Sequence, residues 1–130
     1  MAVKKTTKSK KKTVTQASVG NLYVQATYNN TIITATDLNG NTLAWASAGH
    51  CGFKGPKKAT PYASSVIVRQ LADKLAPIGL KEVHVFITGI GGGRDSAVRS
   101  LNTSGFNVIS LKDLTPIPHN GCRAPKPRRM

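Results

Sequence analysis

The pattern that most limits the fold of this chain is an alternation of apolar and polar residues that begins near residue 21. This period-two spacing is typical of a strand with one buried face. Its apolar positions are Leu22, Val24, Ala26 and Tyr28. Two β-branched segments follow at residues 31–37 and 42–48, separated by short turns that are rich in asparagine. Three strands joined by two short turns predict an antiparallel meander.

The second half of the chain alternates between helix and strand signals. Thr60-Pro61 suits a helix start, because threonine caps helix N-termini and proline fits the first turn. That helix should end before Pro77, and a nearly continuous apolar run at 82–88 predicts a strand buried on both faces. A second helix is predicted at 94–103 and a last strand at 106–111. Because strand–helix–strand units need parallel neighbours, the order βββαβαβ predicts an α/β domain with a mixed five-stranded sheet.

Charge divides the chain into a body and two basic ends. The net charge of +14 comes from 19 Lys and Arg residues against 5 Asp and Glu residues. Six lysines lie within residues 1–12 and four cations within residues 123–130, so the other 110 residues hold nine cations and five acids. Such blocks of like charge are disordered alone and indicate a polyanion partner. We predict a basic disordered tail at 1–18, one α/β RNA-binding domain at 19–114, and an extended, basic, proline-rich tail at 115–130.

Composition excludes several classes of protein. No apolar run approaches the roughly 18–20 residues of a membrane span, and the N-terminus lacks the apolar stretch of a signal peptide. The two cysteines, Cys51 and Cys122, are too few for a disulfide scaffold, which favours a reducing cytosol. We therefore expect a cytoplasmic protein with no membrane partner.

A glycine-rich loop lies between a predicted strand and a predicted helix. The backbone N–H groups of Gly91, Gly92 and Gly93 would face an anion at the helix N-terminus, and Arg94 and Arg99 follow on that helix. Arg94 replaces the third glycine of the dinucleotide fingerprint, and the Gly-Lys-Ser/Thr of a nucleotide-binding P-loop is absent. An RNA phosphate is therefore the favoured ligand. A free nucleotide and a tight turn without ligand are the alternatives.

A second basic loop precedes the first predicted helix. Lys54, Lys57 and Lys58 stand on a glycine–proline scaffold that includes Gly55, an arrangement that suits phosphate contacts. Phe53 is suited either to stacking on a base or to covering the edge of the core. A solvated loop without ligand is the alternative for the segment.

The C-terminal segment is stiffened by prolines at 116, 118, 125 and 127, which favour an extended path. A stiff cationic segment loses less entropy on binding than a flexible one, and this suits a segment that threads along structured RNA. The residues that should shape its entry into RNA are His119, Asn120 and Gly121. The cations expected on phosphates are Arg123, Lys126, Arg128 and Arg129.

Metal binding and catalysis have little support in the sequence. His50-Cys51 and His119-x-x-Cys122 offer four zinc ligands, but an adjacent His-Cys pair is an unusual spacing and Cys-x-x-Cys is absent. The five acids are scattered, and no Ser/Cys–His–acid grouping is suggested. We expect no metal, no cofactor and no enzymatic activity. A general polyanion binder and a nucleotide-dependent enzyme are the rival functions.

Four segments taken together resemble a known family. They read TPIPHNGCRAPKPRRM, GFKGPKKATPYA, GIGGGRDSAVRSLN and YNNTIITATDLNGN. They are similar to the eleventh protein of the small ribosomal subunit, bacterial type, and the resemblance extends over about residues 14–130. The most specific stretch runs from Pro116 to Arg123.

The resemblance implies a structural protein of the small-subunit platform that binds 16S-type ribosomal RNA (rRNA) near the exit site and the path of messenger RNA. It also implies roles in translation and subunit assembly, with small-subunit proteins seven, eighteen and twenty-one as neighbours. The implied fold is ribonuclease-H-like, a mixed sheet with helices on both faces. A bacterial cytoplasm and a plastid both fit the resemblance.

Individual residues carry the resemblance with some departures. Asn29 and Asn30 match the hairpin turn of the family and are expected to contact RNA. Lys54 and Lys57 stand where the family usually has arginines, and lysine keeps a phosphate contact but loses bidentate geometry. Arg94 keeps its family position.

Overall fold

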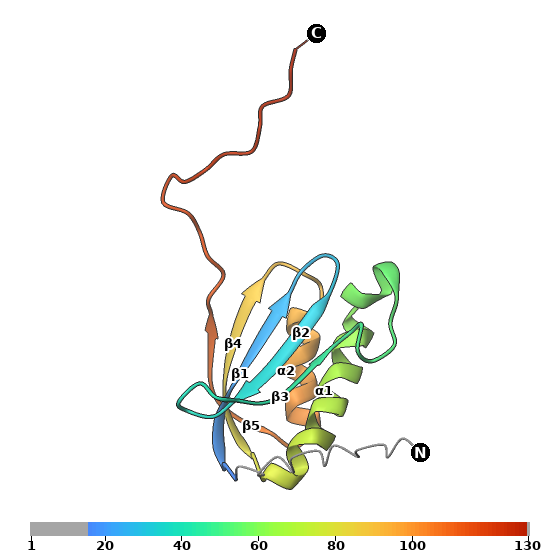
Figure 1. Cartoon of the computed structure of the whole chain (residues 1–130), viewed down its shortest axis with the longest axis vertical. Coiled ribbons are helices and arrows are strands. Elements are labelled where there is room, and N and C mark those ends of the chain that lie inside the picture. Colours follow the sequence, from blue (N-terminus) through green and yellow to red (C-terminus); the bar gives the residue numbers. More distant parts are fainter. Residues whose placement is uncertain (1–15, 130) are drawn as a thin grey trace, which may run out of the picture.

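The computed structural model describes residues 16–129, and the predicted element order βββαβαβ is confirmed within them (Figure 1). The basic tail predicted at 1–18 lies almost wholly outside the described residues. The strands are β1 (Val19–Ala26), β2 (Thr31–Thr36), β3 (Thr42–Ser47), β4 (Glu82–Gly89) and β5 (Asn107–Asp113). The helices are α1 (Pro61–Leu75) and α2 (Arg94–Thr103), with the short 3-10 helices η1 (Gly55–Ala59) before α1 and η2 (Ala76–Ile78) after it.

The strands form one mixed sheet in the order β3-β2-β1-β4-β5, with β2 antiparallel to both of its neighbours and the β1–β4 and β4–β5 pairs parallel. The connections β3–α1–β4 and β4–α2–β5 cross the sheet in the same direction. Because such crossovers are right-handed, both helices reach the same face. They pack side by side there, where Ser100 Oγ donates to Ser65 Oγ at 3.2 Å (Figure 1). The mixed sheet is confirmed, whereas the placement of helices on both faces is wrong.

The helix-covered face of the sheet carries the alternating apolar residues. Leu22, Val24 and Ala26 of β1 are buried, as are Val83 and Val85 of β4. The helices cover this face with the buried residues Ala63, Ile67, Val68, Leu71, Leu75, Ala97 and Leu101. The period-two pattern therefore identified the buried face of β1 correctly.

The other face of the sheet has no helix over it among residues 16–129. His84 and Phe86 of β4 are therefore only half-buried, so the prediction of a strand buried on both faces is wrong. Phe86 stacks on Tyr23 of β1, with ring centroids 5.2 Å apart. Tyr28, predicted to belong to the buried stripe, is 73% exposed because β1 ends at Ala26.

The first helix begins as the sequence predicts. Thr60 Oγ1 accepts from the Ala63 N–H at 3.4 Å, and Pro61 occupies the first turn of α1. At the end of α2, Gly105 takes a left-handed conformation with φ of +92°, and the Phe106 N–H donates to the Leu101 carbonyl. Thr60 and Gly105 therefore mark where α1 begins and where α2 ends.

Candidate nucleic-acid interface

The topology brings the predicted RNA-binding segments to one end of the sheet. Because β2 runs antiparallel to β1 and β3, the strands β1, β3, β4 and β5 share one direction, and their carboxyl ends lie at the same end. Each of these ends leads into one predicted segment (Figure 1). The β1–β2 turn follows β1, the segment that leads into α1 follows β3, the glycine loop follows β4, and the C-terminal tail follows β5. We call residues 27–30, 48–60, 89–93 and 114–129 together the loop end.

The β1–β2 turn is closed by its own hydrogen bonds. The Thr27 N–H donates to the Asn30 carbonyl at 2.8 Å, and the Asn30 N–H donates to Thr27 Oγ1 at 3.0 Å. Asn30 Oδ1 accepts from the Thr31 N–H at 2.8 Å. Asn29 is exposed. The structure thus gives Asn30 a part in building the turn and presents Asn29 at its tip.

The lysine-rich segment lies open at the start of α1. Lys54, Gly55 and Lys57 are exposed, and Lys58 is half-buried. The Thr60 hydroxyl donates to the Lys57 carbonyl at 2.7 Å, which ties η1 to the helix that follows. The three lysines predicted to contact phosphates therefore lie on one short, hydrogen-bonded turn.

Aromatic side chains at the loop end divide into covered and exposed ones. Phe53 is half-buried, packs against the core and meets Tyr62 edge-on with ring centroids 6.0 Å apart, so it covers the edge of the core. Tyr62 itself is 67% exposed, and Tyr28 is exposed in the β1–β2 turn. The sequence did not predict that these two tyrosines are exposed. Periodicity placed Tyr28 in the buried stripe, and no local pattern indicated the exposure of Tyr62.

The glycine loop packs tightly against the end of β1. The Gly91 N–H donates to the Ala26 carbonyl at 3.1 Å, so this group is already used within the fold. A Cβ on Gly91 would lie 2.3 Å from the Thr27 carbonyl oxygen, which makes glycine a packing requirement there. Gly92 is exposed, and no side chain caps α2 after Gly93. The first-turn N–H groups of a helix lack intrahelical partners and attract anions, so exposed Gly92 and the start of α2 are suited to an anion, whereas Gly93 is buried.

Arg94, at the start of α2, is only partly exposed, because its side chain makes contacts within the fold. Its side chain is 29% exposed. Nη1 donates to the Gly89 carbonyl at 2.6 Å, and Nη2 forms an ion pair with Asp113 Oδ2 at 2.5 Å. A guanidinium has five N–H donors, so these contacts leave donors for a phosphate. Arg99 is exposed five residues further along α2, on a different side of the helix from Arg94.

The C-terminal tail extends away from the body (Figure 1). Residues 116–129 contain no helix or strand, and all of them are exposed. Asn120 has a left-handed φ of 63°, which bends the tail where the Asn-Gly pair predicts a turn. The predicted contact residues of the tail are therefore open to a partner: His119, Asn120, Gly121, Arg123, Lys126, Arg128 and Arg129.

Asp113 stands at the base of this tail. The hydroxyl and the N–H of Thr115 donate to its carboxylate at 2.6 and 3.0 Å, and Arg94 pairs with it. The Thr115 bonds, with Arg94 after them, lower the pKa of Asp113 to about 2. The carboxylate is therefore ionised at neutral pH and faces the guanidinium of Arg94.

The described residues contain no group of three or more His, Cys, Asp and Glu side chains placed to hold a metal ion. Instead, Cys51 Sγ donates to Gln70 Oε1 at 2.5 Å, and Cys122 lies in the exposed tail. In the same part of the chain, no helix has the length and apolar character needed to cross a membrane.

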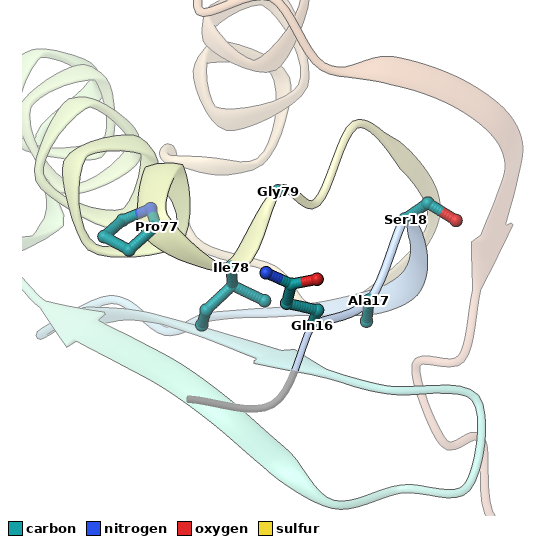
Figure 2. A pocket seen from close by; sticks show the side chains of 6 residues that line it. All are labelled: Gln16, Ala17, Ser18, Pro77, Ile78 and Gly79. Atoms are coloured by element: carbon teal, nitrogen blue, oxygen red, sulfur yellow. The ribbon is translucent and has the colours of Figure 1, made fainter. Parts of the chain in front are cut away.

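A hollow of about 440 Å³ lies at the opposite end of the sheet, where the chain enters β1 beside η2 (Figure 2). It is lined by Gln16, Ala17, Ser18, Pro77, Ile78 and Gly79. None of these side chains carries a charge or a titratable group, so the hollow offers no cation to a phosphate and no acid–base chemistry.

The fold and the loop end together define a class, an α/β protein whose basic loops and tail suit a polyanion. The chain matches the family model "Ribosomal protein S11" over residues 20–129. It is 54% identical to "Small ribosomal subunit protein uS11" of Treponema pallidum (strain Nichols) and 52% identical to the protein of that name in Borreliella burgdorferi (strain ZS7), over 130 residues and 100% of each chain. The protein of that name in Nitratidesulfovibrio vulgaris is 50% identical over 121 residues, 93% of this chain and 94% of the relative.

This chain therefore belongs to the ribosomal protein S11 family, as the resemblance of its motifs implies. The family is one of structural ribosomal proteins and not of enzymes, which confirms the prediction of no enzymatic activity.

Proposed function

We propose that this protein is a structural constituent of the small ribosomal subunit and binds 16S-type rRNA through its loop end. The observation that carries the proposal is the shared direction of four strands, which gathers exposed lysines, an uncapped helix start and an exposed cationic tail at one end. Phosphate contacts from such groups supply much of the affinity of RNA-binding proteins and fix their register. The names of the relatives as small-subunit proteins support the same function.

Each predicted residue has a place in this proposal. The phosphate-contacting cations are Lys54, Lys57, Lys58, Arg94, Arg99, Arg123, Lys126, Arg128 and Arg129. Gly92 and the first turn of α2 offer N–H groups to a phosphate, and Gly93, which is buried, lets the loop pack closely against Ser64 and Thr31. The residues that shape the contacting turns are Asn29, Asn30, Gly55, Gly91, His119, Asn120 and Gly121, and Phe53 supports the lysine-rich turn from the core side.

The family resemblance extends the proposal to a position in the ribosome. We infer that the bound rRNA belongs to the platform near the exit site, where messenger RNA passes. The proposed protein neighbours are small-subunit proteins seven, eighteen and twenty-one. In this position the protein takes part in translation and in assembly of the subunit.

Salt-dependent binding to a fragment of the central domain of 16S-type rRNA tests the proposal. With six to ten phosphate contacts, the affinity should fall by about three to five decades between roughly 50 and 200 mM salt, on the scale established for DNA. Fluorescence anisotropy measures the affinity at each salt concentration. A flat response would contradict binding through phosphates.

A general polyanion binder is the second candidate, because the charge of the two ends alone would attract any nucleic acid. Competition between the rRNA fragment and a random RNA duplex separates the two functions. Preference for the structured rRNA supports the ribosomal function, and equal affinity favours the general binder.

A further inference from the structure

The base of the C-terminal tail is held by side-chain hydrogen bonds that extend beyond the end of the sheet. β5 ends at Asp113, and the Leu114 N–H still donates to the Ile87 carbonyl at 2.7 Å. Asp113 Oδ1 then accepts from the N–H and the hydroxyl of Thr115, at 3.0 and 2.6 Å. Asp113 Oδ2 accepts from Arg94 Nη2 at 2.5 Å. These bonds join the tail to the last residue of the sheet and to the start of α2.

Gly89, at the end of β4, completes this set of contacts. Its N–H donates to Thr115 Oγ1 at 3.2 Å, and its carbonyl accepts from Arg94 Nη1 at 2.6 Å. Gly89 is itself fixed, because its φ is +101° and a Cβ there would overlap the Ala26 carbonyl oxygen. We call Gly89, Arg94, Asp113 and Thr115 the clasp.

The clasp is where the direction of the tail is set. Residues 116–129 are exposed, and within the described chain no backbone hydrogen bond joins them to the body. Pro116 follows Thr115 directly and Pro118 comes two residues later, and because proline fixes φ, both stiffen the chain. A direction imposed at Thr115 is therefore carried into the segment that contains His119, Asn120 and Gly121.

Asp113 is an unexpected residue for this position on electrostatic grounds. It puts a negative charge at the base of a cationic tail, where that charge opposes the attraction of phosphates. Its carboxylate is 52% exposed, and exposed ion pairs add little to the stability of a fold. A role in stability alone therefore does not account for it.

We infer that Asp113 and Thr115 are positioning residues, which use the clasp to aim the C-terminal tail along the RNA bound at the loop end. The inference rests on the proposed function. The clasp orders the base of the tail before binding, so less conformational freedom is lost when the tail meets RNA.

Asp113→Asn and Thr115→Val test the inference in the full-length protein, with Asp95→Asn as the matched control. Asp95 is an exposed acid in the first turn of α2, so both Asp→Asn variants lose one negative charge near the loop end, but only one breaks the clasp. Thr115→Val removes clasp contacts without changing the charge. We expect the affinity for the central-domain rRNA fragment to fall about tenfold in the two clasp variants, and to stay constant or rise in the control.

Two further readouts separate positioning from a general structural role. In a full-length background with Arg123, Lys126, Arg128 and Arg129 replaced by glutamine, the clasp variants should cause no further loss of affinity. In the free protein, ¹⁵N relaxation should show increased motion of the non-proline residues at 117–122 in the clasp variants and no change in Asp95→Asn.

Three results would overturn the inference: unchanged relaxation, an affinity equal to that of Asp95→Asn, or a loss that persists without the tail cations. A failure of the unmodified protein to prefer rRNA over a random duplex would instead overturn the proposed function. The relaxation measurement needs no RNA, so the two failures are distinguishable.

Discussion

The two ends of the sheet are built on the same five strands, yet they differ in the segments that follow those strands. At the opposite end from the loop end, the β2–β3 turn closes on Asp37, whose Oδ1 accepts from the N–H groups of Asn39 and Asn41 at 2.9 Å each. The backbone bond from Asn41, with others after it, lowers the pKa of Asp37. At the loop end, by contrast, α2 starts without a side-chain cap and the tail leaves without a partner strand. Both ends therefore contain turns closed by their own hydrogen bonds, but only the loop end also has an uncapped helix start and a free cationic tail.

Charged residues are also distributed unequally between the two ends of the sheet. Three of the five acids, Asp37, Asp73 and Glu82, lie at or near the opposite end, because they follow β2, end α1 and begin β4. Lys74 and Lys81 lie among them. The lysines at 54, 57 and 58 and the cations of the tail all belong to the loop end. The body outside the two basic ends carries a net charge of only +4, so it is the topology that gathers its lysines at 54, 57 and 58 beside the cationic tail.

Neutralising the tail cations should cause the largest loss of rRNA affinity, because it removes the main difference in charge between the two ends. Replacing Arg123, Lys126, Arg128 and Arg129 with glutamine removes up to four phosphate contacts, so we expect the affinity for rRNA to fall on the order of a hundredfold at roughly 100 mM salt. The salt dependence should become shallower by about four units of slope. Anisotropy titrations at several salt concentrations measure both quantities.

The matched control neutralises the four cations of the body that are not predicted RNA contacts: Arg69, Lys74, Lys81 and Lys112. It changes the net charge by the same amount and should retain most of the affinity. An equal loss in both variants would show that total charge, and not its position, governs binding.

The glycine loop allows a sharp comparison between neighbouring residues. Gly91→Ala places a Cβ 2.3 Å from the Thr27 carbonyl oxygen, and we expect this overlap to cost about 1–3 kcal/mol in the free energy of unfolding. Gly92→Ala meets its nearest atom, the Ala59 carbonyl oxygen, at 3.6 Å, so its effect should stay within about 0.5 kcal/mol. Thermal and urea unfolding measure the difference. Equal stabilities would contradict the close approach of the loop to β1.

The lysine-rich turn should contribute less to binding than the tail. Lys54→Gln combined with Lys57→Gln should weaken rRNA binding about tenfold and reduce the salt slope by about two. Lys74→Gln combined with Lys81→Gln is the control at the opposite end. An equal loss of affinity in the control pair and the test pair would show that the lysine-rich turn does not contact the rRNA.

The smallest expected effect is a pH dependence at the base of the tail. The pKa of Asp113 is lowered to about 2, chiefly by Thr115, so the pairing with Arg94 is fully present above the ordinary carboxyl pKa near 4. It is lost as the pH falls through about 2, because protonation removes the charge that Thr115 and Arg94 stabilise. NMR titration of the Thr115 amide should show a midpoint near 2, and Thr115→Val should move the Asp113 midpoint upward. A midpoint near 4 in the unmodified protein would contradict the observed hydrogen bonds.

Local patterns predicted the elements well, because strand periodicity and the Thr60-Pro61 cap act over a few residues. They did not predict the layering, because the side of the sheet that a helix covers depends on strand order across the whole chain. The same limit explains β4, whose apolar run indicated two buried faces although both helices lie on one. The ion pair between Arg94 and Asp113 could not be predicted either, because the two residues are distant in sequence and no local pattern indicates their contact. The exposure of Lys54, Lys57 and the tail cations was easier to predict, because it depends little on tertiary contacts, and their contacts with RNA stay a prediction.

The most direct test of the account maps ultraviolet crosslinks between the full-length protein and the central-domain rRNA fragment onto the protein by mass spectrometry. We expect crosslinked peptides from the loop end, at residues 27–30, 48–60, 89–93 and 114–129, and from Arg94 beside it. Crosslinks gathered instead at the opposite end, at residues 37–41 and 76–82, would contradict the account.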